Sequence, residues 1–153
     1  MGSGIAACIA RAGLSLSVYD SDEAKISAAT SAPLIVKNTA DTILKECDLI
    51  LFCVPSASQI DSVLSIAPPK SGATLIDLTS SDPRTTKLRA EKLLAENNAY
   101  QLDAAMSGGA KGAAAGTLTL MVGGDKHILE RHRAILSCFA NQIFYIGDAG
   151  KGQ

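Results

Sequence analysis

Aromatic residues and long apolar runs are scarce in this sequence. It has no tryptophan, and aromatic residues make up 4% of its 153 positions. The strongest apolar run, Leu49 to Val54, is far too short to cross a bilayer. The first residues also lack the charged and then apolar pattern of a secretory signal. We therefore expect no membrane partner, and no aromatic platform for a nucleotide base.

The sequence also lacks an excess of either charge. Its 14 basic and 15 acidic residues give a formal net charge of -1 without a basic cluster, so nothing favours nucleic acid as a partner. The four cysteines show neither a Cys-x-x-Cys pair nor a metal-like spacing. Their apolar surroundings favour core thiols in a reducing cytosol, and hence a cytoplasmic protein without a metal site. His127 and His132 fall in a charged segment, where we expect surface histidines rather than ligands.

Apolar residues, by contrast, are plentiful and occur in alternating strand-like and helix-like segments. They make up 47% of the chain and charged residues 19%, which predicts one well-buried domain over residues 1–153. The expected strands cover residues 16–19, 34–36, 49–54, 73–76, 100–103, 117–122 and 142–146. The expected helices cover residues 3–12, 22–29, 39–46, 56–66, 82–97 and 126–139.

The ends of these segments carry the signals that helices use. Asn38 or Thr39 can cap the helix that follows it, and Ser81 or Asp82 can cap a longer one with Pro83 in its first turn. Strands that alternate with helices and read as continuous apolar runs predict an α/β fold. We expect a Rossmann-like, doubly wound and mostly parallel sheet.

Acidic residues mark the ends of several expected strands. Asp20, Asp77 and Asp103 end strands or follow them directly. Ligands of open parallel sheets gather at the carboxyl ends of the strands, so the loops beside these residues are the first candidates for a site.

Glycine is concentrated between Asp103 and Gly124. A strand is expected to end at Asp103, the chain to break into a loop at Ser107-Gly-Gly109, and a second strand to follow Gly116. Paired glycines after a serine leave N–H groups unshielded beside a hydroxyl, an arrangement that suits an anion. A hairpin-like loop with ordinary turn glycines is the alternative interpretation.

The first residues offer two registers of a dinucleotide-binding fingerprint. Gly2-Ser-Gly-Ile-Ala-Ala7 matches Gly-x-Gly-x-x-Ala literally, but that fingerprint needs a preceding strand. In the second register Gly2 is the third glycine, Ala6 lets the helix lie close to the sheet, and Gly13 ends the helix. The literal register would put Arg11 at the small position. We therefore adopt the second register, in which the first strand of the sheet is missing from this sequence.

Asp20 then falls near the distance expected for the acid that binds a ribose. Its carboxylate can accept a hydrogen bond from a 2′-hydroxyl and would repel a 2′-phosphate, and no arginine follows it. This pattern favours NAD over NADP as the cofactor. An aspartate that only caps the next helix is the alternative.

Together these features resemble the β-hydroxyacid dehydrogenase family, which includes 3-hydroxyisobutyrate dehydrogenase, tartronate semialdehyde reductase and 6-phosphogluconate dehydrogenase. The resemblance covers residues 1–153 and is carried by residues 2–20, Phe52-Cys-Val-Pro-Ser56, Ile76-Asp-Leu-Thr-Ser-Ser-Asp-Pro83 and 103–124. The last segment resembles the family's substrate-binding signature and is the most specific. The family usually has proline and valine where this chain has Ala105 and Met106.

The resemblance implies a role for each matching residue. The cofactor-binding residues would be Gly2, Asp20, Val54, Pro55, Gln59 and Ser80. Ser107, Gly108 and Gly109 would hold the carboxylate of a small hydroxy-acid substrate. The end of the chain resembles the approach to the family's catalytic lysine, which would follow shortly after Gln153. No catalytic residue is therefore expected within the chain, and Lys151 is not that lysine.

The resulting hypothesis is the NAD-binding domain of a 3-hydroxyacid dehydrogenase, truncated at both ends, without a helical second domain and inactive by itself. The parent enzyme would transfer a hydride between nicotinamide and 3-hydroxyisobutyrate or 2-hydroxy-3-oxopropionate, and could be a homo-oligomer. One alternative is a non-catalytic nucleotide-binding or interaction module that gains a strand from a partner. Another is an enzyme for an imine or a 6-phosphogluconate-type substrate, although Lys111 is the sole cation near the glycine loop.

Overall fold

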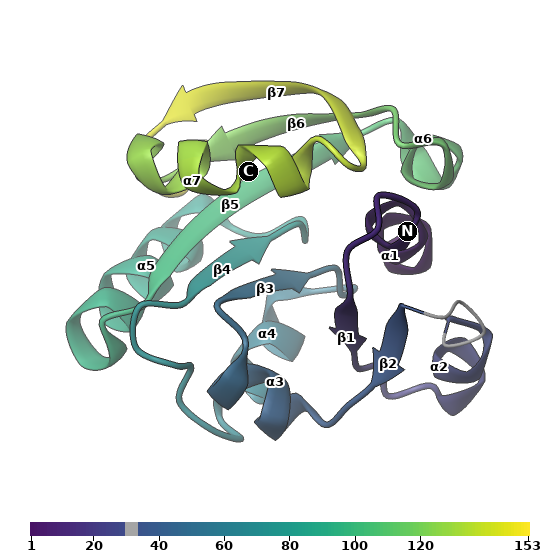
Figure 1. Ribbon diagram of the computed structural model, residues 1–153. Helices are drawn as coiled ribbons and strands as arrows, with labels where there is room; N and C mark the ends of the chain where they lie inside the picture. Colours follow the sequence, from purple (N-terminus) through teal and green to yellow (C-terminus); the bar gives the residue numbers. More distant parts are fainter. Residues whose placement is uncertain (30–33) are drawn as a thin grey trace.

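The computed structural model describes residues 1–29 and 34–153, which form alternating strands and helices (Figure 1). The described strands are β1 (Leu16–Val18), β2 (Ile35–Lys37), β3 (Leu49–Phe52), β4 (Thr74–Asp77), β5 (Tyr100–Ser107), β6 (Leu118–Gly123) and β7 (Ala140–Gly147). The described helices are α1 (Gly2–Arg11), α2 (Glu23–Ala29), α3 (Ala40–Glu46), α4 (Ala57–Leu64), α5 (Pro83–Asn97), α6 (Gly109–Ala115) and α7 (Lys126–Leu136). The predicted α/β class is confirmed.

The strands form two sheets, and most neighbours run parallel. One sheet has the order β3-β4-β5-β6-β7, with only the β5–β6 pair antiparallel, and β1 and β2 form a separate parallel pair. A Rossmann sheet has the strand order 3-2-1-4-5-6. The strands β2, β1, β3, β4 and β5 correspond to its strands 3, 2, 4, 5 and 6. Among the described residues no strand takes the first position, between β1 and β3, as the sequence predicted.

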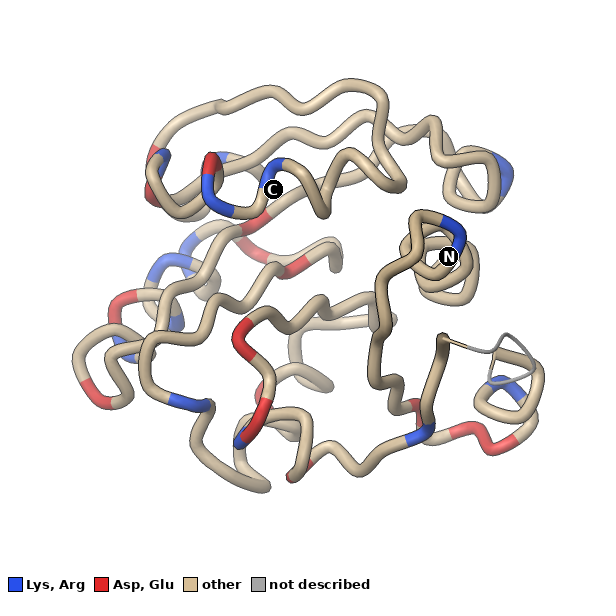
Figure 2. The backbone as a smooth tube through the Cα atoms, in the orientation of Figure 1, with Lys and Arg blue, Asp and Glu red and all other residues tan. Residues whose placement is uncertain are grey.

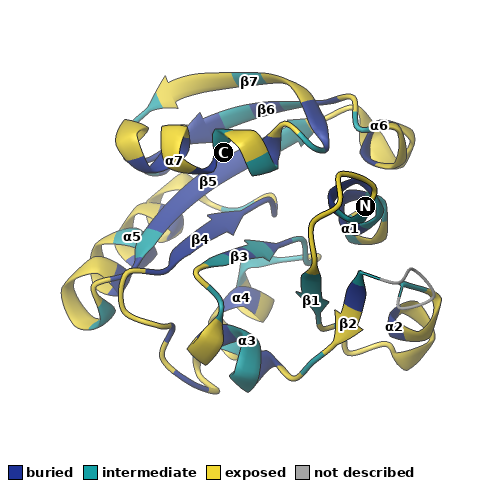
Figure 3. Cartoon of the chain, in the orientation of Figure 1, coloured by how far each residue is buried: buried dark blue, intermediate teal, exposed yellow. Residues whose placement is uncertain are grey.

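Helices cover both faces of the five-stranded sheet. Along β4, Leu75 and Ile76 belong to different core clusters because successive side chains point to opposite faces. One cluster packs the sheet against α1, α6 and α7, and the other packs it against α3, α4 and α5. The buried residues lie along the strands in the middle of the molecule (Figure 3). This arrangement is the doubly wound one.

Side-chain caps explain where three of the helices begin. Thr39 accepts a hydrogen bond from the Thr42 N–H at the start of α3 (3.1 Å), and Asp82 accepts one from the Thr85 N–H at the start of α5 (3.2 Å). Pro83 occupies the first turn of α5. These two caps were among the predicted alternatives and are confirmed. Asp125 caps α7 in the same way.

The glycine-rich stretch differs from the prediction in two respects. First, β5 does not end at Asp103 but continues to Ser107, so Asp103 is an interior strand residue and is fully buried. Second, the expected loop contains a short helix, α6, which begins directly after Gly108. The alanines of this stretch favour a helix once the glycines have made the turn.

His132 was predicted to lie at the surface, but it is buried. It is 9% exposed, and its Nε2 lies 2.9 Å from Oγ1 of Thr74 on β4, whereas His127 is exposed as expected. The reason is that α7 buries Ile128, Leu129, His132 and Leu136 on one face. Burial lowers the pKa of His132 below its ordinary value.

The cysteines lie in the core or beside it. Cys8 is buried, while Cys47, Cys53 and Cys138 are partly exposed and pack against the buried core clusters. Burial raises the pKa of the Cys47 and Cys53 thiols.

Acidic and basic residues are interspersed along the chain, as the red and blue segments of the tube in Figure 2 show. In the described part of the chain, no helix is both long and apolar enough to cross a membrane.

Candidate functional site

The carboxyl ends of three neighbouring parallel strands bring the predicted site residues to one edge of the sheet. Val54 and Pro55 follow β3, Ser80 follows β4, and Ser107 ends β5 with Gly108 directly after it. Because β3, β4 and β5 run parallel, these segments lie side by side, although they are far apart in the sequence (Figure 1). The topology thus brings the two predicted groups, for cofactor and for substrate, to the same edge.

The beginning of α1 lies at this edge as well. Gly2 is its first residue, and a Cβ built there would lie 3.5 Å from Cβ of Cys53, which is ordinary contact. The chain's own packing therefore does not require glycine at this position. The absence of a side chain leaves the first turn of the helix, with its outward N–H groups, open to an anionic group. Since Gly2, Ser3 and Gly4 are all helical, the literal fingerprint register, which needs a turn there, does not describe this chain.

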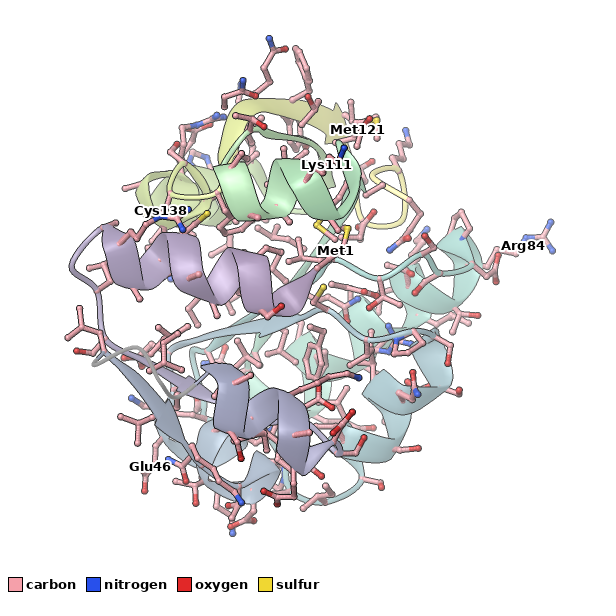
Figure 4. The ribbon with its side chains drawn as sticks, turned by 90° about the vertical axis from the view of Figure 1, so that its right-hand side faces the viewer. Met1, Glu46, Arg84, Lys111, Met121 and Cys138 are labelled. Carbon is pink, nitrogen blue, oxygen red and sulfur yellow. The ribbon has the colours of Figure 1, made fainter. Side chains whose placement is uncertain are left out.

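Gly4 has a different role, because α1 crosses α6 there. A Cβ at Gly4 would lie 2.9 Å from the backbone nitrogen of Ala114, closer than packing allows. Further along α1, Cys8 Sγ donates to the Ala113 carbonyl (3.2 Å) and Arg11 Nη2 donates to the Ala114 carbonyl (2.7 Å). In Figure 4, α6 lies above α1, and Met1 at the start of α1 is on the same side of this pair as Lys111 of α6. The two helices therefore hold the cofactor-side and substrate-side segments together.

Asp20 lies just beyond the carboxyl end of β1 and is partly exposed. Its Oδ1 accepts a hydrogen bond from the Asp22 N–H (2.9 Å), and Asp22 in turn accepts one from the Ala24 N–H at the start of α2 (3.0 Å). Asp22, not Asp20, is therefore the residue that caps α2. The structure holds Asp20 in a defined turn at the strand end, where the ribose hypothesis needs it.

Asp77 organises the turn that follows β4. It is 1% exposed, and its Oδ1 accepts the Thr79 N–H (2.8 Å) while its Oδ2 accepts the Ser81 hydroxyl (3.3 Å). The Thr79 hydroxyl oxygen accepts the Val54 N–H (3.4 Å), which ties this turn to the segment after β3. Burial raises the pKa of the Asp77 carboxyl, and the Thr79 N–H and the Arg89 guanidinium oppose that shift. Ser80 lies between these fixed neighbours and is exposed.

Gln59 also has a structural partner. Its side-chain oxygen accepts the Ser56 N–H (2.9 Å) and so closes the first turn of α4. The residue is exposed at the same edge of the sheet as Val54 and Pro55.

The glycine turn at Gly108 and Gly109 has a backbone conformation that residues with a side chain rarely adopt. Gly108 has φ of 122° and Gly109 has φ of 61°, and a Cβ at Gly108 would lie 3.1 Å from Cδ2 of Leu118. The Gly108 carbonyl accepts the Gly112 N–H (3.0 Å), which starts α6. Ser107, Gly108 and Gly109 are all exposed. The turn thus presents a hydroxyl and unshielded backbone to solvent, as the anion interpretation requires.

Arg89 also belongs to this region, although it is not among the site residues predicted from the sequence. Its side chain is 6% exposed, and it pairs with Asp61 on α4 (2.8 Å) and with Asp77 (3.3 Å). The sequence does contain a signal for this burial. Thr86, Arg89 and Leu93 recur at the spacing of one helix face, and α5 buries all three.

A hollow of about 480 Å³ lies elsewhere, between α5 and the start of α7. Tyr100, Gln101, Gly124 and Tyr145 contribute to its lining. It adjoins the beginning of β5, at the opposite end of that strand from Ser107, and is not the edge described above.

Comparisons with known proteins agree with this geometry. A family model for the NAD-binding domain of 6-phosphogluconate dehydrogenase matches residues 1–147. The chain is 36% identical to the probable 3-hydroxyisobutyrate dehydrogenase of Mycobacterium bovis and 33% identical to the 2-hydroxy-3-oxopropionate reductase of Escherichia coli. Both alignments cover 100% of this chain, but 52% and 53% of the two relatives.

A solved structure shows the same fold. The structure of Mycobacterium tuberculosis 3-hydroxyisobutyrate dehydrogenase with L-serine matches with a TM-score of 0.89 at 29% identity, over 99% of this chain and 53% of that one. The chain therefore spans about half the length of the relatives that it matches. From the family model and these relatives, the chain belongs to the β-hydroxyacid dehydrogenase family, as an NAD-binding domain of the 6-phosphogluconate dehydrogenase type.

Proposed function

We propose that residues 1–153 are the cofactor domain of an NAD-dependent 3-hydroxyacid dehydrogenase. The observation that carries the proposal is the edge at which α1 begins and β3, β4 and β5 end. This edge combines a helix N-terminus without a side chain at Gly2 with the exposed turn of Ser107 and Gly108, and Asp20 supplies a carboxylate beyond the end of β1. Such an edge suits the binding of a dinucleotide together with a small carboxylate.

The residues at this edge fit a nicotinamide dinucleotide. The first turn of α1 would face the pyrophosphate, and Asp20 would accept a ribose hydroxyl. Val54, Pro55, Gln59 and Ser80 would lie along the cofactor. The cofactor would supply the hydride chemistry, while the chain binds and orients it. Because Asp20 is anionic and no arginine follows it, we propose NAD as the preferred form.

The substrate half of the proposal is the glycine turn. Ser107 would donate its hydroxyl to the substrate carboxylate, and the N–H groups of Gly108 and Gly109 would complete the contact. The names of the relatives point to 3-hydroxyisobutyrate or 2-hydroxy-3-oxopropionate as the class of substrate. The resemblance places the proton-transferring lysine outside these residues, so we expect the chain to bind ligands in the cytoplasm without turning them over.

Calorimetry with NAD and NADP tests the cofactor proposal. We expect NAD to bind more tightly than NADP, and Asp20→Ala to weaken NAD binding about tenfold, since hydrogen bonds to a charged group contribute about 1.5 kcal/mol or more. Asp22→Ala is the matched control, because it removes a neighbouring exposed carboxylate that caps α2 instead. Equal NAD affinity in the parent chain and in Asp20→Ala would contradict the proposal.

One observation favours a second function, that of an interaction module. In the described part of the chain, β1 and β3 each have one edge that pairs with no strand, and Leu16, Leu49 and Leu51 beside these edges are only partly buried. Such edges accept a strand from another chain. Self-association in light scattering, together with no affinity for NAD or NADP, would favour this function over the first.

A further inference from the structure

The segment after β7 is bound to the middle of β5 by one buried carboxylate. Asp103 is fully buried, and its Oδ1 accepts the Gly150 N–H (2.8 Å) while its Oδ2 accepts the Gly152 N–H (2.7 Å). Both carboxylate oxygens therefore accept hydrogen bonds from the same short segment. Burial raises the pKa of Asp103, and the two N–H donors oppose that shift by favouring the charged form.

The same segment packs too closely for any side chain at its glycines. A Cβ at Gly152 would collide with the backbone nitrogen of Gly123, and a Cβ at Gly150 would collide with the Pro83 carbonyl. The Gly152 carbonyl also accepts the Ala105 N–H (2.9 Å). Gly152 thus lies directly on the backbone of β5 and β6 and Gly150 lies against the start of α5, and the Asp103 carboxylate binds both residues.

The segment ends at the candidate cofactor edge. Oε1 of Gln153 accepts the Ser81 N–H (2.9 Å), and the Ser81 hydroxyl donates to Asp77 (3.3 Å). Asp77 accepts the Thr79 N–H, and Thr79 accepts the Val54 N–H. A continuous series of hydrogen bonds therefore joins the ends of β3 and β4 to Gln153, which directly follows the Gly152 that Asp103 binds.

We infer that Asp103 is a positioning residue for cofactor binding, which acts through Gln153 on the turn around Ser80. This inference rests on the proposed function. Asp103 itself is sealed from solvent within β5, so it contacts no ligand. It holds the segment that places Gln153, and Gln153 holds the backbone of Ser81 in the conformation that presents Ser80 at the edge.

The first test uses the isosteric substitution Asp103→Asn. Asparagine keeps the volume of the side chain, but its amide group would face one of the two N–H donors with another donor. We expect NAD affinity in calorimetry to fall about fivefold, the equivalent of one hydrogen bond. Asp125→Asn is the matched control, because Asp125 also accepts two backbone N–H groups but has no link to Ser81. A loss of thermal stability in Asp103→Asn with unchanged NAD affinity would overturn the inference.

A double-mutant cycle tests the route through Gln153. Gln153→Ala removes the acceptor for Ser81 from a partly exposed position and should leave the fold intact. Both substitutions act on the same Ser81 N–H. We therefore expect the NAD affinity of the double mutant to be no lower than that of the single mutant with the lower NAD affinity. If the fold-losses of NAD affinity in the two single mutants multiply in the double mutant, Asp103 acts by another route and the inference is overturned.

Amide hydrogen exchange without cofactor separates this inference from the proposed function. We expect the amides of Gly150, Gly152 and Ser81 to exchange faster in Asp103→Asn than in the parent chain and in Asp125→Asn. If the parent chain binds neither NAD nor NADP, the proposed function fails. The exchange rate of the Ser81 amide still shows whether Asp103 acts on Ser81 through Gln153. Unchanged exchange at Ser81 would overturn the inference whatever the cofactor result.

Discussion

Arg89 and Asp77 form a buried ion pair, with 3.3 Å between Nη1 of Arg89 and Oδ2 of Asp77, and their side chains are 6% and 2% exposed. The carboxylate of this pair holds the turn that carries Ser80, while Arg89 reaches on to Asp61 on α4. One buried arginine therefore joins α4, α5 and the end of β4 at the candidate cofactor edge.

Removing the arginine should be costly because it leaves a buried carboxylate unpaired. We expect Arg89→Met to lower the free energy of unfolding by about 3 kcal/mol, measured by urea denaturation. Asp61→Asn is the control. The Asp61 side chain is 57% exposed, so its ion pair with Arg89 should contribute about 1 kcal/mol or less to stability. Similar losses in the two variants would show that the buried pair is not the dominant interaction.

Two glycines of α1 should respond in opposite ways to the same substitution. Gly4→Ala places a Cβ against the α6 backbone, so we expect it to lower the free energy of unfolding by about 2 kcal/mol. Gly2→Ala has room beside Cys53 and should leave stability unchanged or raise it by up to about 1 kcal/mol, while it weakens NAD binding. Thermal unfolding with and without NAD measures both effects. A Gly2→Ala chain that binds NAD like the parent would argue against the pyrophosphate position.

Ser107 should affect substrate binding without affecting the fold. Its side chain is exposed, so we expect Ser107→Ala to change the free energy of unfolding by less than about 0.5 kcal/mol. Binding of 3-hydroxyisobutyrate to the NAD-loaded chain, followed by NMR titration, should weaken about fivefold with the loss of one hydrogen bond. Ser65→Ala, an exposed serine at the end of α4, is the control. An equal effect of the two substitutions would rule out the carboxylate role.

His132 should make the protein less stable in mild acid. Burial lowers its folded-state pKa below 6.5, so the unfolded chain binds the proton more readily. This group's contribution to stability is therefore complete above about pH 6.5 and is lost as the pH falls through the window between that value and the lower folded pKa. We expect His132→Gln to flatten the pH dependence of urea denaturation between pH 7.5 and 5, with His127→Gln, a substitution of an exposed histidine on the same helix, as the control. A parent chain equally stable at both pH values would contradict this.

Segments with a strong local signal were predictable from sequence. The caps Thr39 and Asp82, the α/β alternation, and the empty first position of the sheet followed from residues close together in the chain. The glycine turn at Gly108 and Gly109 also followed, although the continuation of β5 to Ser107 and the helix α6 did not. A run of alanine with interspersed glycine is compatible with both a loop and a helix, and packing against α1 decides between them.

The sequence by itself determined the class of fold and the family, because periodicity, caps and glycine motifs act over a few residues. Only the tertiary structure decided that Arg89, Asp103 and His132 are buried, and which partners they have. Each of these polar side chains finds its partner on an element distant in the chain or in a closely packed turn. Burial of such groups depends on hydrogen bonds that exist only once the strands and helices have assembled.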